Sequence, residues 1–370
     1  MVGSRRLRPT PVFGSYWHLA AERQSVFFRR VRGEAPPWTM DPVIGAHRFT
    51  NTYRASDRVS QYLINEVVYA GSFDAESTVL RILLFKIFNR VETWQTLERE
   101  SGPLTAETFD AARLTRVLDS RMADGGRLYS AAYIMPSPQL GQPRKHANHL
   151  LLLEGMLRRG IVGRILDAKS LQELFGLLSG VPSFGPFLAF QFAIDLNYSD
   201  VFDFSEMDFV VAGPGARDGI AKCFEDAGSV PADDLIRAVA ETADQRFEEL
   251  GISFQSLWGR PLQLIDCQNL FCEVSKYSRV AHPEVLGTSG RTRIKQRFAP
   301  APRTVAVSYP PKWGLPVTAG FACDPARVDL SAGDLDRPLQ EVDGDGFPRR
   351  RFDLSPDPVA GENSLFPVVG

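Results

Sequence analysis

Hydrophobic residues recur every three or four positions along most of the chain, which is the spacing of the buried face of an α-helix. This pattern predicts helices over five stretches, at residues 78–98, 144–160, 170–180, 232–251 and 261–280. Most segments carry this spacing rather than the strict alternation of a β-strand. We therefore expect a mainly α fold.

The two ends of the chain depart from this pattern. Residues 1–45 are rich in aromatic residues and prolines, and residues 291–370 lose helical periodicity and become rich in proline, glycine and aspartate. Such composition is typical of irregular or loosely packed chain. We expect an N-terminal extension over 1–45, a helical domain over 46–290 and an irregular C-terminal appendage over 291–370.

The stretch "SGVPSFGPFLAFQFAIDLNYS", residues 179–199, predicts two helices joined by a tight hairpin. Ser170 and Glu173 have the spacing of a capping box, which begins the first helix. Gly180 stands where this helix would end. Pro186 suits the first position of the second helix, where its missing N–H group costs nothing.

Two glycine-containing turns are candidate phosphate sites. Ser183, Phe184 and Gly185 form the hairpin, and the N–H groups that follow them can bind a DNA phosphate of any sequence. Gly213 and Gly215, in "AGPGARDGI", lead into another predicted helix and can hold a second phosphate. A plain αα-hairpin and a simple turn are the alternatives without a ligand.

Charge and cysteine content limit the class of protein. The formal net charge of −2 argues against a surface that is basic throughout, although basic runs at 5–8, 29–33 and 291–297 allow a local DNA-binding groove. No apolar run approaches the ~20 residues of a membrane span, no signal peptide is recognised, and the four cysteines match no zinc spacing. We expect a cytoplasmic protein without membrane, metal or cofactor.

Carboxylates follow the hairpin in "DVFDFSEMDF". Here the chain resembles the helix-hairpin-helix DNA glycosylases, in which a catalytic aspartate follows the hairpin by a little over twenty residues. Asp208 stands 23 residues after Gly185 (208 − 185). A carboxylate near the sugar would stabilise the positive charge that develops during cleavage of the base–sugar bond. Glu206 is the second catalytic candidate, and Asp203 is close enough to compete.

Phe187 occupies the position at which many of these glycosylases place a lysine for Schiff-base chemistry. The resemblance therefore implies a monofunctional glycosylase, an N-glycosyl hydrolase that flips the nucleotide out of the duplex and leaves an abasic site.

Polar residues form a stripe on each of two otherwise apolar predicted helices. Such stripes either face solvent, as on an ordinary amphipathic helix, or provide a wall that hydrogen-bonds the edge of a flipped base. The first stripe contains Asn51, Arg54, Arg58, Gln61 and Asn65, with Asp57 beside them, and the second contains Asp266, Asn269, Glu273 and Lys276.

Longer segments, among them "LLFKIFNRVETW", "DFVVAGPGARDGI" and "DCQNLFCEVSKY", resemble the α-glutamyl/putrescinyl-thymine pyrophosphorylase family over about residues 16–280. This family is also described as the helical domain associated with hydroxymethyluracil DNA kinases. It is regarded as a derived helix-hairpin-helix glycosylase. The resemblance implies a base pocket lined by Asn51, Tyr53, Arg54, Asp57, Arg58, Gln61, Asn269, Glu273 and Lys276.

These features lead to three functional hypotheses. The first is a DNA glycosylase that excises a bulky modified pyrimidine, such as glucosylated hydroxymethylcytosine, from double-stranded phage DNA as anti-phage defence. The second is a biosynthetic enzyme of thymine or hydroxymethyluracil hypermodification in DNA. The third is a module that binds modified DNA without catalysis. The sequence leaves the oligomeric state open.

Overall fold

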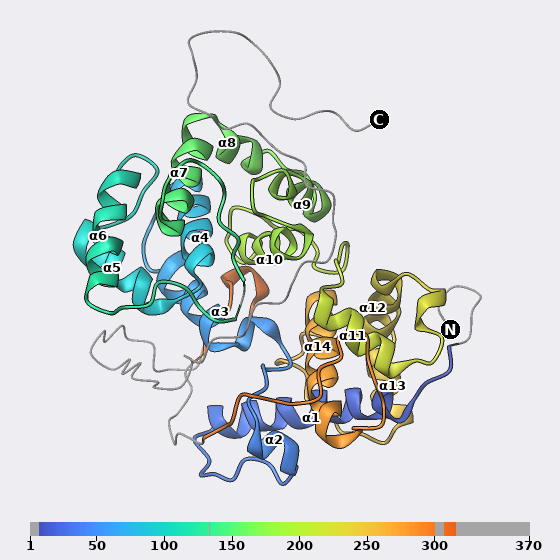
Figure 1. Cartoon of the computed structure of the whole chain (residues 1–370). Coiled ribbons are helices and arrows are strands. Elements are labelled where there is room, and N and C mark those ends of the chain that lie inside the picture. The colour runs from blue at the N-terminus through green and yellow to red at the C-terminus, as the bar shows by residue number, and fades with distance from the viewer. Residues whose placement is uncertain (1–6, 133, 300–306, 316–370) are drawn as a thin grey trace. The chain divides into compact units, whose positions relative to one another are not determined.

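Helices make up most of the described chain (Figure 1). The computed structural model describes residues 7–132, 134–299 and 307–315. In these ranges extended backbone pairs only at isolated bridges, such as that between His47 and Arg297. The expected mainly α fold is confirmed. No helix in the described part is both long enough and apolar enough to cross a membrane.

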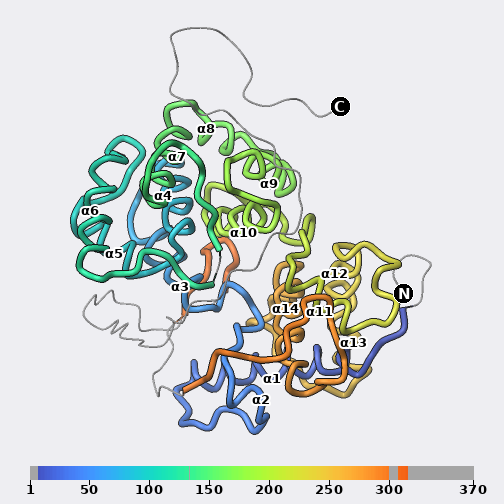
Figure 2. Tube along the Cα trace, viewed as in Figure 1, coloured from blue at the N-terminus to red at the C-terminus, as the bar shows by residue number. Residues whose placement is uncertain are grey.

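The described helices belong to two compact units. The second unit is the continuous stretch Tyr62–Asp203, and the first unit combines residues 7–61 with the described residues from 204 to 315. In Figure 2 the first unit contains the blue start of the trace and its yellow and orange part, while the second unit contains the cyan and green part.

The first unit is built on the packing of α11 against α14. Its elements are α1 (Pro11–Val31), α2 (Pro42–Ala46), the 3₁₀ turn η1 (Arg54–Ser56), the start of α3 (Arg58–Tyr62), α11 (Pro214–Cys223), η3 (Ala227–Ser229), α12 (Ala232–Glu241), α13 (Ala243–Glu249), α14 (Leu264–Ala281) and η4 (Pro311–Trp313). The rings of Trp17 and Phe271 are almost completely buried in its core.

Residues 11–31 differ from the irregular extension expected for 1–45, because they form the 21-residue helix α1. Pro11 occupies the first helical position, and the Thr10 side chain caps the helix by accepting a hydrogen bond from the Val12 N–H group at 3.2 Å. Aromatic residues such as Tyr16 and Trp17 are buried on this helix. Proline and aromatic content therefore indicated a helix start and a core face here, not irregular chain.

The second unit is centred on α4 and α10. Its elements are the end of α3, the π-helix η2 (Leu63–Val68), α4 (Ala75–Phe88), α5 (Val91–Ser101), α6 (Ala111–Ala123), α7 (Lys145–Arg158), α8 (Ile161–Leu166), α9 (Leu171–Ser179) and α10 (Pro186–Leu196). A buried ion pair of 2.7 Å joins Lys86 to Asp195. The single helix predicted over 78–98 is divided, because Asn89 adopts a left-handed backbone conformation that ends α4.

The helix-hairpin-helix predicted around residues 170–196 is present as α9, a short turn and α10. Ser170 accepts a hydrogen bond from the Glu173 N–H group at 3.1 Å, and Pro186 begins α10 directly after Gly185. The ring of Phe184 in the turn stacks on the ring of Phe192 in α10, with their centroids 4.3 Å apart.

Replacement of Ser170 by alanine is expected to destabilise the fold by about 1 kcal/mol, because the first turn of α9 loses its side-chain cap. Urea denaturation followed by circular dichroism measures this difference. Ser170→Asp is the matched control, since aspartate also caps helices and should retain most of the stability. An unchanged unfolding midpoint for Ser170→Ala would show that this cap contributes nothing.

Candidate active site in the first unit

Glu206 is a buried carboxylate in a turn of the first unit. Only 5% of the residue is exposed, and its Oε1 atom lies 3.0 Å from a guanidinium nitrogen of Arg260. Burial raises the pKa of Glu206 to about 7, although the positive charge of Arg260 opposes the shift. The group therefore changes charge close to neutral pH.

Asp266 lies in the first turn of α14 and adds a second carboxylate to this region. One of its oxygens accepts the Arg54 N–H group at 2.8 Å, and the other accepts the Gln263 N–H group at 3.1 Å. Burial raises the pKa of Asp266 to about 6, and the negative charge of Asp266 in turn raises the pKa of Glu206. Two carboxylates with raised pKa values are thus electrostatically coupled.

Three cations and the ring of Trp313 lie near these carboxylates. The guanidinium of Arg260 lies over the ring of Trp313 at 3.7 Å from its centroid. The positive charges of Arg54 and Lys312 are close enough to lower the pKa of Glu206, which shows that they belong to the same cluster. We call Glu206, Arg260, Asp266, Arg54 and Lys312 the Glu206 cluster.

A piece of the predicted C-terminal appendage is attached to this cluster. The Gln61 amide exchanges two hydrogen bonds of 2.9 Å with the backbone of Ser308. The hydroxyl groups of Ser56 and Tyr309 are 2.7 Å apart. Residues 307–315 therefore pack on the wall that sequence analysis assigned to a base pocket, while the rest of the appendage beyond residue 315 lies outside the described residues.

Other predicted pocket residues form a second network along α14. The Asn51 N–H group donates to Asp57 at 2.8 Å, and Arg23 donates to the Asn51 side chain at 2.9 Å. Burial raises the pKa of Asp57 to about 7. Glu273 accepts the Thr50 N–H group at 3.0 Å. Two carboxylates of α14 thus hold the loop of residues 50–54, at its start through Glu273 and at its end through Asp266.

All nine predicted pocket residues lie in the first unit. Tyr53 is buried and donates its hydroxyl hydrogen to the Arg260 carbonyl at 2.7 Å, and Lys276 pairs with Glu273 at 2.8 Å. Arg58 is exposed on α3. Asn269 is half-buried on α14, one turn beyond Asp266, and its side chain has no hydrogen-bond partner in the described chain. A base-binding role for this set remains a prediction.

The two catalytic candidates differ in their surroundings. Asp208 is exposed, and Arg237 binds the backbone carbonyls of Met207 and Asp208 instead of the Asp208 carboxylate. Glu206 is buried against Arg260. The geometry therefore favours Glu206 over Asp208 as the catalytic carboxylate. The role of each residue remains a prediction. Sequence analysis missed Arg260 and Trp313, because neither belongs to a periodic pattern or motif.

The predicted phosphate sites fall in different units. Ser183, Phe184 and Gly185 belong to the second unit, whereas Gly213 caps the start of α11 in the first. Gly215 lies inside α11, where an added Cβ atom would overlap the sulfur of Cys272 on α14. Helix packing accounts for this glycine, and phosphate binding at these turns remains a prediction. No group of three metal-ligating side chains is found among the described residues.

Comparison with known proteins gives two matches. Residues 10–287 match the family described as "5-hmdU DNA kinase, helical domain". A 5-hmdU DNA kinase of Bacillus phage SP10 is 28% identical over 302 aligned residues, which cover 74% of this chain and 46% of the phage protein. The chain thus spans a little under half the length of this relative. No solved structure matches it.

These matches confirm the resemblance to the helical domain associated with hydroxymethyluracil DNA kinases. They contradict the leading hypothesis of a DNA glycosylase with a hydrolase activity in anti-phage defence, because the family and the relative are described by a DNA kinase and not by base excision. The hairpin-to-aspartate spacing was misleading, since it is a distance along the chain and carries no information about the reaction.

Proposed function

The chain belongs to the family of 5-hmdU DNA kinase helical domains, and from this premise we propose that it acts in the synthesis of a hypermodified thymine in DNA. The proposed substrate is 5-hydroxymethyluracil in DNA that carries a phosphate or pyrophosphate ester on its hydroxymethyl group. The observation that supports this proposal is the Glu206 cluster, which combines a carboxylate of pKa about 7 with positive charges.

The proposed reaction is substitution at the exocyclic carbon by a primary amine. Glu206 accepts a proton from the amine nitrogen while the carbon–nitrogen bond forms. The bond between carbon and ester oxygen breaks, and phosphate or pyrophosphate leaves with the bonding electrons. Arg260, Arg54 and Lys312 supply positive charge near Glu206, which would stabilise the leaving group.

The surroundings of the cluster suit a base that has been turned out of the duplex. Aromatic side chains commonly stack on flipped bases, and Trp313 lies against Arg260 in the cluster. The Asn269 amide is available to hydrogen-bond a base edge. The 370-residue sequence contains no Gly-Lys-Ser/Thr loop of the kind that holds ATP phosphates. We therefore propose that this protein acts after the base has been phosphorylated. Its substrate would be DNA in the cytoplasm.

The test is to incubate the protein with duplexes that contain 5-hydroxymethyluracil, its phosphate ester or its pyrophosphate ester, each with a mixture of primary amines. Digestion to nucleosides and mass spectrometry should show a new 5-aminomethyl adduct from one ester and release of the matching phosphate. The unesterified duplex is the control and should remain unchanged. Binding of the duplex without any product would overturn the proposed reaction. Formation of abasic sites would also overturn it, because such sites result from base excision.

A further inference from the structure

A second surface of the first unit lies beyond the family match, which ends at residue 287. After α14, basic residues occupy every second position from 291 to 297, in a segment that forms one isolated bridge, between Arg297 and His47. We call Arg291, Arg293, Lys295 and Arg297 the basic strip. All four are exposed, whereas Ile294 is buried.

The backbone of the basic strip is held in place by its neighbours. The Arg48 N–H group donates to the Gln296 carbonyl at 3.2 Å, and the Phe298 N–H group donates to the Ala46 carbonyl at 3.0 Å. The Arg279 side chain of α14 donates to the Arg293 carbonyl at 3.2 Å. Hydrogen bonds at Arg293 and at the C-terminal end of the strip therefore fix its backbone.

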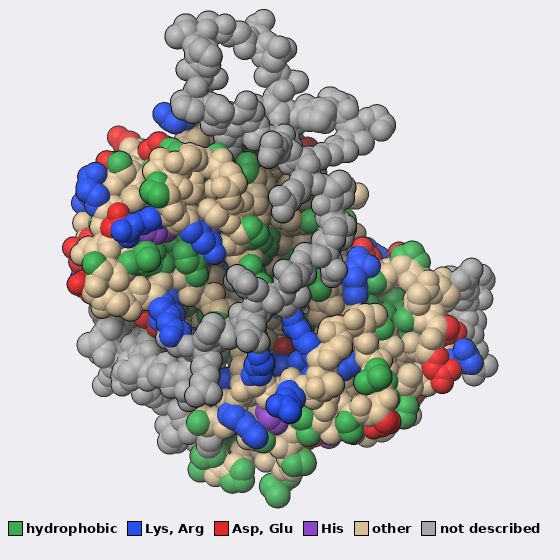
Figure 3. All heavy atoms as spheres, viewed as in Figure 1, with side chains coloured by type: hydrophobic (Ala, Val, Ile, Leu, Met, Phe, Trp, Pro, Cys, Tyr) green, Lys and Arg blue, Asp and Glu red, His purple; other side chains and the backbone are tan. Residues whose placement is uncertain are grey.

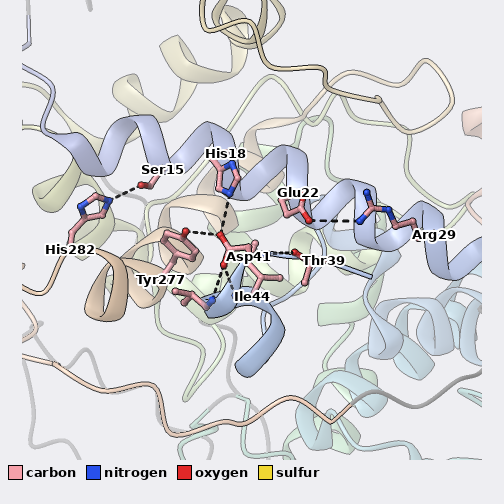
Figure 4. Close-up of polar contacts among 10 residues, drawn as sticks. Ser15, His18, Glu22, Arg29, Thr39, Asp41, Ile44, Tyr277 and His282 are labelled. Atoms are coloured by element: carbon pink, nitrogen blue, oxygen red, sulfur yellow. Dashed lines mark hydrogen bonds and ion pairs between the residues drawn. The ribbon is translucent and has the colours of Figure 1, made fainter. Parts of the chain in front are cut away.

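The segment that pairs with the strip follows α2, and α2 is itself anchored (Figure 4). One oxygen of Asp41 accepts the N–H groups of Val43 and Ile44 at 2.8 Å each. The other oxygen contacts His18 of α1 at 3.1 Å and accepts the Tyr277 hydroxyl of α14 at 2.8 Å. The segment on which the strip packs is therefore held in place by hydrogen bonds. A fixed backbone loses less conformational entropy when a ligand binds to the strip.

The four side chains of the strip are exposed to solvent. In the part of the chain that the structure describes, none of its four side chains forms an ion pair. Burial lowers the pKa of His47, and the positive charges of Arg297 and Lys276 lower it further. Lys and Arg side chains gather over the first unit where this segment runs (Figures 1 and 3). A chain of net charge −2 therefore concentrates positive charge here.

We propose that the basic strip is a docking track for the phosphate backbone of duplex DNA. A cluster of exposed cations that form no ion pair in the described chain can bind phosphates of a DNA strand without reading base sequence. The choice of DNA rests on the proposed function. The strip would hold the duplex by its backbone while a nucleotide is presented to the chemical site.

The test measures the affinity for an unmodified DNA duplex of about two helical turns by fluorescence anisotropy over a range of salt concentrations. The strip variant carries Arg291→Gln, Arg293→Gln, Lys295→Gln and Arg297→Gln. Loss of four phosphate contacts should reduce the log–log salt slope by about 3–4 and weaken binding at 0.1 M salt by at least about tenfold.

The matched control removes four positive charges from the second unit, through Arg116→Gln, Arg158→Gln, Arg159→Gln and Lys169→Gln, and should keep most of the slope. The variant Arg291→Lys, Arg293→Lys and Arg297→Lys retains the charges and should bind like the wild type. If the strip variant fails to fold, Arg293→Gln and Lys295→Gln are tested singly, and each should lower the slope by about 0.9.

An unchanged slope in the strip variant, or an equal loss in the control, would overturn the proposal. Loss of binding to vesicles of anionic lipid, with duplex binding intact, would overturn it in favour of a membrane surface. The duplex in this experiment carries no reactive ester, so the outcome is independent of the chemistry. If the slope changes as expected and no amine adduct forms, only the proposed reaction fails.

Discussion

Substitution of Glu206 by glutamine is expected to lower the rate of amine substitution by about a hundredfold or more, because the reaction loses the group that accepts the proton from the nucleophile. Glutamine keeps the shape and the hydrogen-bonding capacity of the side chain beside Arg260. Duplex affinity should therefore be retained. Single-turnover rates, measured by mass spectrometry of the nucleosides, separate the chemical step from binding.

The pH dependence of this rate provides a second readout. A general base must be deprotonated, and burial raises the pKa of Glu206 to about 7. The rate of the wild-type protein should therefore rise as the pH passes through about 7 and level off above it. The residual rate of Glu206→Gln should lack this rise. A merely structural role for Glu206 would lower the rate without removing the pH dependence.

Two further variants decide between the carboxylates. Glu248→Gln removes an exposed carboxylate of α13 and is the matched control for loss of one negative charge. Asp208→Asn tests the exposed alternative, and we expect a much smaller effect than for Glu206→Gln. If Asp208→Asn abolishes the reaction while Glu206→Gln is active, the catalytic role moves to Asp208.

The same pKa shift links Glu206 to folding stability. The pKa is raised in the folded protein, so the folded state holds the proton more tightly than the unfolded chain does. The resulting stabilisation is complete below the ordinary carboxyl pKa of about 4.3 and is lost as the pH rises through about 7. As the pH rises from about 4.3 to about 7, the free energy of unfolding of the wild type should therefore fall relative to that of Glu206→Gln.

Replacement of Gly219 by alanine is expected to lower the free energy of unfolding by about 3 kcal/mol or more. Gly219 lies on α11, where an added Cβ atom would overlap the backbone oxygen of Phe271 on α14. No side-chain rotation relieves a clash with backbone, so the two helices must separate. Since this contact is the centre of the first unit, urea denaturation should show a large shift of the midpoint.

Gly14 provides the matched control on α1, because a Cβ atom added there meets no other atom within 4 Å. Gly14→Ala should stabilise the protein by about 0.5–1 kcal/mol through helix propensity alone. The free energy of unfolding of Gly215→Ala should lie between those of Gly219→Ala and Gly14→Ala, because the side chain of Cys272 can move away. Wild-type stability in Gly219→Ala would show that α11 and α14 are packed less closely than described.

The sequence by itself determined the local structure of this protein. Periodic apolar residues predicted the helices because a helix buries one face at fixed spacing, and Ser170 and Pro186 marked helix starts because caps act on adjacent backbone. The family was also recognisable from segments of the chain alone. The same local reasoning misjudged residues 11–31, where composition outweighed the apolar spacing of α1.

Only the tertiary structure distinguishes the surroundings of the two candidate carboxylates. Glu206 and Asp208 are two residues apart, yet one is buried and the other is exposed. The pKa of Glu206 depends on burial and on Arg260, which is 54 residues away along the chain. Likewise, the docking of residues 307–315 places Trp313 over Arg260. Desolvation and Coulomb interactions act through space, so no spacing along the sequence specifies them.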